Sequence, residues 1–144
     1  MKLSPPASVK PASFRLTTAF ALLMSLAACS SGTTVPTYVV TTPYAMQAQV
    51  NGTLAIQDGC LVLVTPIDVT GLAWPEGAKW SDLARSIELG GVRASVGDDV
   101  VLGGGEAQWP DDPDPEDWVV VPTVECRATD RYLVVSALVE VSND

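Results

Sequence analysis

The chain has 144 residues and a mass of 15.1 kDa, which is enough for one hydrophobic core and too little for two. Its formal charge is −9, and from position 29 onward five basic side chains face seventeen acidic ones, or −12. Such a surface repels phosphate backbones, so we expect no nucleic-acid partner. The absence of histidine excludes Ser-His and Cys-His nucleophile pairs and every His-ligated metal site.

The first 28 residues have the charge and hydropathy pattern of a signal peptide. The early basic residues are Lys2, Lys10 and Arg15, and no acid accompanies them. A mostly apolar run follows over residues 16–28. Thirteen residues suit the apolar region of a signal peptide and are too few to span a bilayer as a helix.

This run ends in Leu26-Ala27-Ala28-Cys29, which resembles the lipobox of bacterial lipoproteins at all four positions. The resemblance implies cleavage before Cys29, a diacylglyceryl thioether on its sulfur, and acylation of the new amine by a fatty acid such as palmitate. We therefore expect a lipid anchor in the cell envelope, with the domain on the periplasmic or extracellular side. An ordinary secretory signal with an incidental cysteine, or a buried cysteine in a core helix, remain alternatives.

Residues 29–46 are rich in Ser, Thr and Pro and carry no charge. This composition is typical of a flexible tether, which would hold the folded domain off the membrane. Local strand pairing at Tyr38, Val39 and Val40 would move the boundary of that tether.

Residues 47–144 alternate apolar and polar side chains with period two, the pattern of half-buried strands. Asp58-Gly59 and Gly90-Gly91 predict two tight hairpins. The other expected strands cover residues 70–74, 100–102 (closed by three glycines), 119–126 and 131–141, the last with an apolar face of Leu133, Val135, Ala137, Val139 and Val141. At most one helical turn is expected, near Ser81. The prediction is an all-β fold, a small antiparallel barrel or sandwich, with the OB-type barrel as the specific candidate because Gly97-Asp98 resembles its Gly-Asp turn.

Several short motifs of this domain are similar, as a set, to those of small bacterial lipoproteins. They are Gly59-Cys60-Leu61, Trp74-Pro75-x-Gly77-x-x-Trp80, Gly97-Asp98-x-Val100-x-Leu102-Gly103-Gly104-Gly105-Glu106 and Glu125-Cys126-Arg127. The resemblance covers residues 52 to about 141. It implies a common fold, and no activity or catalytic residue comes with it.

Two cysteines remain once Cys29 is lipidated. An even pair in an exported domain predicts a disulfide between Cys60 and Cys126. The alternative is a pair of reduced, buried thiols.

Four tryptophans, Trp74, Trp80, Trp109 and Trp118, fall near predicted strand ends or loops. Beside carboxylates and glycines they are candidates for a sugar- or peptide-binding surface. The competing interpretation, which we favour, is that they plug the open ends of the barrel.

Residues 111–117 hold five carboxylates in seven positions, a density that resembles an oxygen-ligand calcium loop. The segment lacks the spacing and the internal glycine of an EF-hand, and two prolines stiffen it. A solvated surface loop is the better interpretation, so we expect no metal and no cofactor.

The sequence therefore predicts a membrane-anchored, non-enzymatic binding module of the envelope, without catalytic residues and with an envelope protein or glycan as partner. The first alternative is a hydrolase of envelope glycans that uses a carboxylate pair. The second is a purely structural envelope protein. A long groove lined by tryptophan and two carboxylates would favour the hydrolase.

Overall fold

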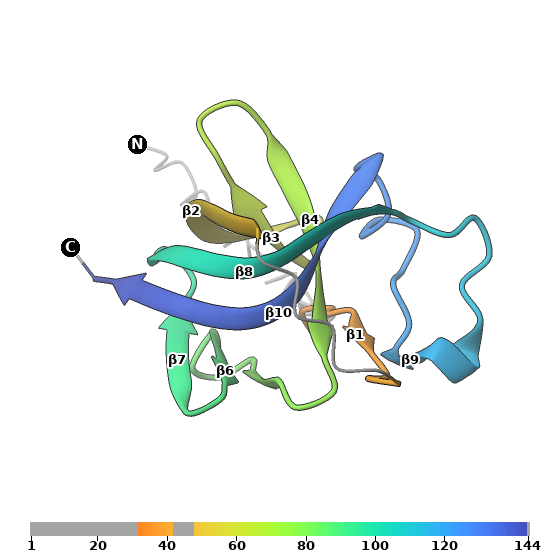
Figure 1. Cartoon of the computed structure of the whole chain (residues 1–144), viewed down its shortest axis with the longest axis horizontal. Helices are drawn as coiled ribbons and strands as arrows, with labels where there is room; N and C mark the ends of the chain where they lie inside the picture. Colours follow the sequence, from red (N-terminus) through yellow and green to blue (C-terminus); the bar gives the residue numbers. More distant parts are fainter. Residues whose placement is uncertain (1–31, 42–47, 144) are drawn as a thin grey trace, which may run out of the picture.

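The computed structural model describes residues 32–41 and 48–143, and this part of the chain is almost entirely β-structure (Figure 1). It contains ten strands and one short 3-10 turn. Their bounds are β1 Thr37–Tyr38, β2 Ala48–Gln57, β3 Cys60–Val64, β4 Val69–Pro75, β5 Lys79–Ser81, β6 Ser86–Leu89, β7 Val92–Ser95, β8 Asp99–Gln108, η1 Pro115–Asp117, β9 Trp118–Val120 and β10 Arg131–Ser142.

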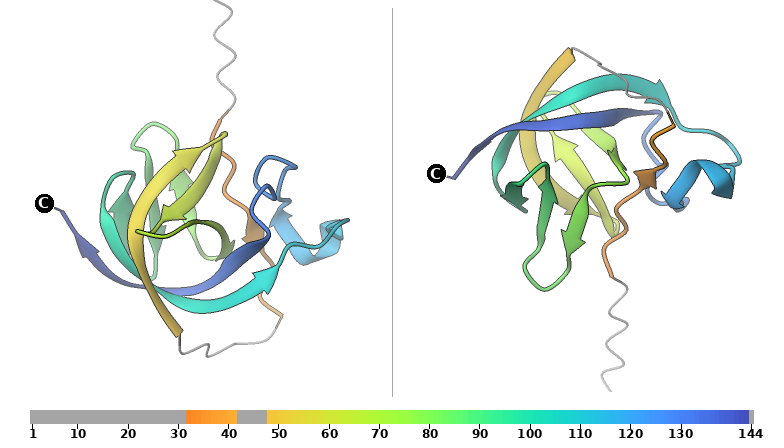
Figure 2. Two further views of the ribbon diagram at one scale, coloured as in Figure 1. Left: turned by 90° about the horizontal axis from the view of Figure 1, so that it is seen from above. Right: turned by 60° about the horizontal axis from the view of Figure 1, so that its bottom comes forward.

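Five of these strands close into a barrel. The larger sheet runs β10-β8-β2-β3-β4-β1-β9, and an additional parallel pairing between β10 and β4 joins its first strand to its fifth. Figure 2 shows these strands curling round a common interior. In the closed order β2-β3-β4-β10-β8 the parallel neighbours are β4 and β10, the third and fifth barrel strands along the chain, and this order resembles that of an OB-type barrel. The predicted all-β barrel is confirmed, with mixed instead of purely antiparallel pairing. The other pairings of the ring are antiparallel.

The barrel interior is filled by the inward residues of each strand, as the period-two pattern predicts. Its largest fully buried side chain is Trp74, on β4. The other buried members include Leu54, Leu61, Leu63, Leu72, Val100, Leu102, Leu133, Val135 and Leu138, and Ile87 and Ala94 come from the small β5-β6-β7 sheet, which covers one end of the barrel.

Both predicted tight turns are confirmed. Asp58 and Gly59 have φ values of 51° and 78°, and they join β2 to β3 with Gln57 opposite Cys60. Gly90 and Gly91, at 60° and 80°, join β6 to β7. Two successive residues with positive φ match the right-handed twist of the flanking strands.

The apolar face predicted for the last strand is correct at Leu133, Val135 and Val141, which contact the core, and wrong at Ala137 and Val139, which are exposed. Register shifts between Val135 and Ala137 and between Leu138 and Glu140 turn the strand twice. As a result Leu138 points inward, whereas Val139 is 49% exposed. Bulges of this kind bend a strand. Both lie after residues 132–134, the segment of β10 that pairs with β4.

The sequence suggested that the three glycines after Leu102 end a strand, and this is wrong: β8 continues through them to Gln108. Gly104 is required by a close approach of β10, since an added Cβ would lie 2.1 Å from the carbonyl oxygen of Val134. At Gly103 the nearest atom to an added Cβ is 3.5 Å away, an ordinary contact.

Residues 33–40, expected as part of the tether, pack against the barrel. The amide of Thr34 donates to the Gly59 carbonyl (2.7 Å) and Trp74 N donates to the Pro36 carbonyl (2.8 Å). Val35 is buried in the core and β1 pairs in parallel with β4. The predicted signal peptide, Cys29 and residues 42–47 lie outside the described residues. Over 32–41 and 48–143, no helix has the length and apolarity needed to cross a membrane.

We predict that Gly104→Ala lowers the free energy of unfolding by about 2–3 kcal/mol, because the new methyl group must displace the β10 backbone. Gly103→Ala, one residue away on the same strand, is the matched control and should cost less than about 1 kcal/mol. Urea denaturation of both variants measures the difference. Equal losses would show that β8 and β10 do not approach as closely as described.

Candidate ligand surface

A disulfide fixes the long connection between β8 and β10 to the barrel. The sulfur atoms of Cys60 and Cys126 are bonded, with 5.4 Å between the Cα atoms, so the predicted pairing is confirmed. The predicted strand over residues 119–126 is wrong beyond Val120: β9 covers Trp118–Val120, and Cys126 lies in a turn. With Val62, the two cysteines form a small buried cluster outside β3.

Four aromatic side chains gather on the outside of the barrel. Trp109 stacks on Tyr132 with ring centroids 3.9 Å apart and planes 19° apart. Trp118 lies 6.1 Å from Trp109 and 6.3 Å from Tyr132 in tilted geometry, and Tyr38 packs against the same cluster. Such offset and tilted pairs suit the quadrupoles of aromatic rings.

Two features seat Trp109 in this cluster. Its Nε1 donates to Thr129 Oγ1 (3.1 Å). Gly71, on the outer face of β4, leaves room for the indole, because an added Cβ would lie 2.8 Å from Trp109 Cζ2.

This cluster and the disulfide cover the outer side of β3 and β4. In OB-type barrels the face of the second and third strands, together with the loops beside it, commonly holds the ligand. Here Val62 on β3 and Ala73 on β4 are buried beneath the β8–β10 connection and the aromatic side chains. This face of the barrel is therefore covered by the chain itself.

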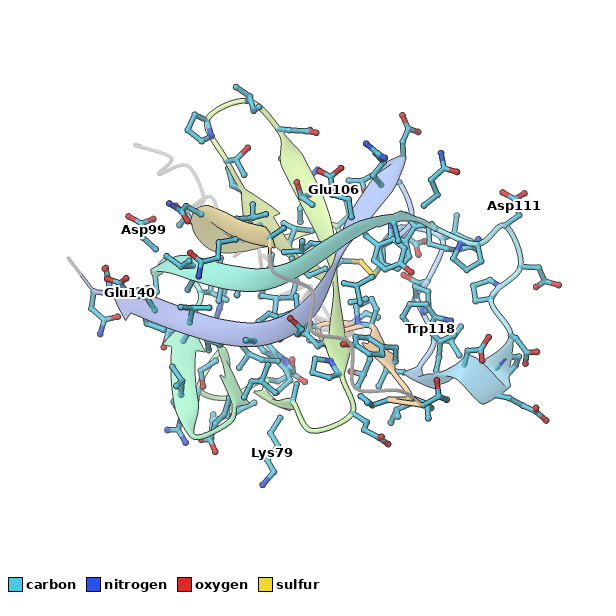
Figure 3. All side chains as sticks on the ribbon, in the orientation of Figure 1. Lys79, Asp99, Glu106, Asp111, Trp118 and Glu140 are labelled. Atoms are coloured by element: carbon cyan, nitrogen blue, oxygen red, sulfur yellow. A yellow bond between two sulfur atoms is a disulfide. The ribbon has the colours of Figure 1, made fainter. Side chains whose placement is uncertain are left out.

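An open depression of about 540 Å³ lies at the edge of the aromatic cluster, between the N-terminal arm, β9 and β10. Three aromatic side chains line it: Tyr38, Tyr132 and Trp118, the last of which is labelled in Figure 3. The Tyr38 hydroxyl donates to the Val135 carbonyl (2.7 Å), which fixes that ring. The remaining lining comes from Val39, Val40, Thr41, Gln108, Pro110, Asp117 and Val134.

The structure separates the four tryptophans of the predicted surface. Trp74 is fully buried, with its Nε1 unpaired within the described chain, so it belongs to the core and to no surface. Trp80, on β5, packs against the core and donates to Asp82 Oδ1 (2.8 Å). Trp109 and Trp118 come together, and of these Trp118 borders the depression.

Sequence reasoning missed the two tyrosines. Tyr132 alternates out of phase with Leu133, which marks it as an outward residue of the last strand. Tyr38 was assigned to the tether, so its part in the surface could not be anticipated.

The acidic segment is a surface loop with a short ordered end. Asp114 Oδ1 accepts from Glu116 N (3.0 Å) at the start of η1. Arg127 Nη1 donates to the carbonyls of Pro110 (3.1 Å) and Asp111 (2.7 Å), which ties the start of the loop to the turn of Cys126. Among the described residues, no three Cys, Asp or Glu side chains gather as metal ligands would.

A second depression, of about 640 Å³, contains two carboxylates, Asp99 and Glu140 (Figure 3). Thr53 Oγ1 donates to Asp99 Oδ1 (2.5 Å). Its described lining includes Asn51, Val64 and Pro66 but no tryptophan. The tryptophan-lined groove with paired carboxylates that would favour a glycan hydrolase is therefore not present in the described part of the chain.

No protein-family model matches this sequence, and neither a curated protein nor a solved structure matches it significantly.

We predict that Tyr38 and Tyr132 lose their phenolic protons at a higher pH than an exposed tyrosine does. Burial raises the pKa of Tyr132 above its ordinary value of 10.0, and burial followed by the nearby charge of Tyr132 raises the pKa of Tyr38. The folded protein then keeps these protons when the unfolded chain has lost them. The free energy of unfolding should thus be unaffected by them below about pH 10 and fall as the pH rises above it.

Phenolate absorbance measures this titration directly. Tyr132→Phe should remove one late-titrating group and also lower the pKa of Tyr38. Titration of both tyrosines at the ordinary value would mean that the aromatic cluster is solvated.

Proposed function

We propose that the protein is a lipid-anchored, non-enzymatic binding module of the bacterial cell envelope that takes an extended polypeptide of an envelope partner. The lipobox supports the anchor at Cys29. The lack of histidine and the single lysine after position 28, Lys79, support the non-enzymatic assignment.

The observation that carries the proposal is the continuity between the aromatic depression and an open sheet edge. Trp118 borders the depression and is also the first residue of β9, which ends the sheet order. No described strand pairs with the second edge of β9. Val119 and Val120 of β9 and the following Val121 have exposed side chains, and that of Val119 is 58% exposed.

An open strand edge offers backbone donors and acceptors to an added strand, and adjacent pockets select side chains. Aromatic rings at the edge supply contact area with little entropic cost. A glycan could stack on the rings and bond single backbone groups through its hydroxyls, but an extended polypeptide matches the repeat of donors and acceptors along a strand edge. The edge therefore favours a polypeptide over a sugar as the ligand.

The anchoring part of the proposal predicts that Cys29→Ser abolishes incorporation of an alkyne fatty acid and moves the protein from the membrane to the soluble fraction. The diacylglyceryl group is attached to the sulfur of Cys29, and the hydroxyl group of a serine at this position does not form that bond. Ser31→Ala, two positions away, is the control and should label like the native protein. Lipid label retained in Cys29→Ser would overturn the lipoprotein assignment.

The binding part predicts that a photo-crosslinking amino acid at Val119 forms a discrete adduct in intact cells. The same residue placed at Val139, 49% exposed on β10, is a matched control and should give no such adduct, because that valine lies away from the β9 edge. Indistinguishable products from the two positions would contradict recognition at β9.

A further inference from the structure

The turn between β5 and β6 contains a leucine whose side chain is almost completely exposed to solvent. Leu83 is 99% exposed. The turn is nevertheless well ordered: the Ser81 hydroxyl oxygen accepts from Ala84 N (3.1 Å), and the Arg85 carbonyl accepts from Val96 N (2.9 Å). Because the backbone is fixed on both sides, Leu83 has little freedom to fold back onto the protein.

The described N-terminal arm begins at this same turn. Thr33 N donates to Asp82 Oδ1 (3.0 Å), next to the bond from Trp80. These two donors, Trp80 first, lower the pKa of Asp82, so the carboxylate stays charged as their acceptor. In the right view of Figure 2 the orange arm starts beside the green segment that contains the turn.

The distance from this turn to the proposed anchor is short. Cys29 precedes Gly32 by three positions, and an extended chain spans at most 3.3–3.6 Å per residue, so their Cα atoms are separated by no more than about 11 Å. If Cys29 carries lipid, the membrane surface must therefore lie close to the turn of Leu83.

The distribution of charge agrees with this orientation. Residues 76–97, which contain the small β5-β6-β7 sheet, carry three basic and three acidic side chains. The rest of 32–143 carries two basic and thirteen acidic ones. Lys79 points away from the molecule on the side of the small sheet, and Asp111 lies far from it (Figure 3). The end near the anchor is thus the end that an anionic lipid surface repels least.

We propose, resting on the lipid anchor at Cys29, that the turn of Leu83 is a second membrane contact. Leu83 enters the interfacial region of the bilayer, and Arg85 of the same turn, with Lys79 at the other end of the β5–β6 ladder, meets anionic headgroups. A single apolar side chain binds too weakly to anchor a protein, but the lipid already holds it at the surface. The contact therefore fixes the orientation of the domain, which sits on the membrane instead of being held off it by a long tether.

The test uses the lipidated full chain in vesicles of phosphatidylethanolamine and phosphatidylglycerol. Leu83→Cys and, as matched control, Ile67→Cys are labelled with an environment-sensitive fluorophore. Ile67 is 95% exposed in the β3–β4 turn, which lies across the barrel from the small sheet (Figure 1). We expect a blue shift, a several-fold gain in intensity and quenching by spin-labelled lipids at position 83, and none of these at position 67.

An aqueous signal at position 83, equal to that at position 67, overturns the proposal while leaving the anchor intact. A blue shift at position 83 without quenching by spin-labelled lipid also overturns it, because it places Leu83 against protein. Failure of the anchor itself is detected separately, since the purified chain would then lack lipid by mass spectrometry and would not float with the vesicles.

Discussion

The fold depends on the way in which β10 closes the barrel. This strand pairs antiparallel with β8 along its length and parallel with β4 near its start, over residues 132–134. Both pairings are needed, because without the second the sheet would stay open and expose the apolar faces of Leu72 and Leu133. Two bulges bend the strand, and Gly104 allows its backbone to approach β8.

Closure of the barrel also determines which surfaces remain for recognition. The connection from β8 to β10 returns across the outside of β3 and β4, where the Cys60–Cys126 disulfide and the stacked Trp109 hold it in place. The face that OB-type barrels commonly use is thereby filled by the chain itself. The open surface of the described residues includes the aromatic depression with the free edge of β9, and the depression of Asp99 and Glu140.

The N-terminal arm links the two proposed contacts. At its start Thr33 is hydrogen-bonded to Asp82, the residue before Leu83. Further along, Val35 is buried in the barrel core and Tyr38 lines the aromatic depression. Because the arm is packed against the barrel from Thr34 to Tyr38, a lipid at Cys29, as proposed, would be joined to the domain by a short segment. A partner on the membrane or in the envelope would meet β9 in a fixed orientation, with the acidic loop of residues 111–117 beside it.

The all-β class, the two hairpin turns and the disulfide pair could be predicted from the sequence, because alternation, positive-φ glycines and cysteine parity are local or countable properties. The sequence also predicted the lipobox, which lies outside the described residues. The burial of Trp74 in the core, the exposure of Val139 and the contact of Tyr38 and Tyr132 with Trp118 depend on the folded barrel and were not predictable from local patterns. The physical reason is that bulges change which face a residue occupies, and that uncharged Ser-, Thr- and Pro-rich chain has no pattern of its own. Whether such a segment is a tether or a strand depends on the free strand edge that it meets, and that edge exists only once the barrel has closed.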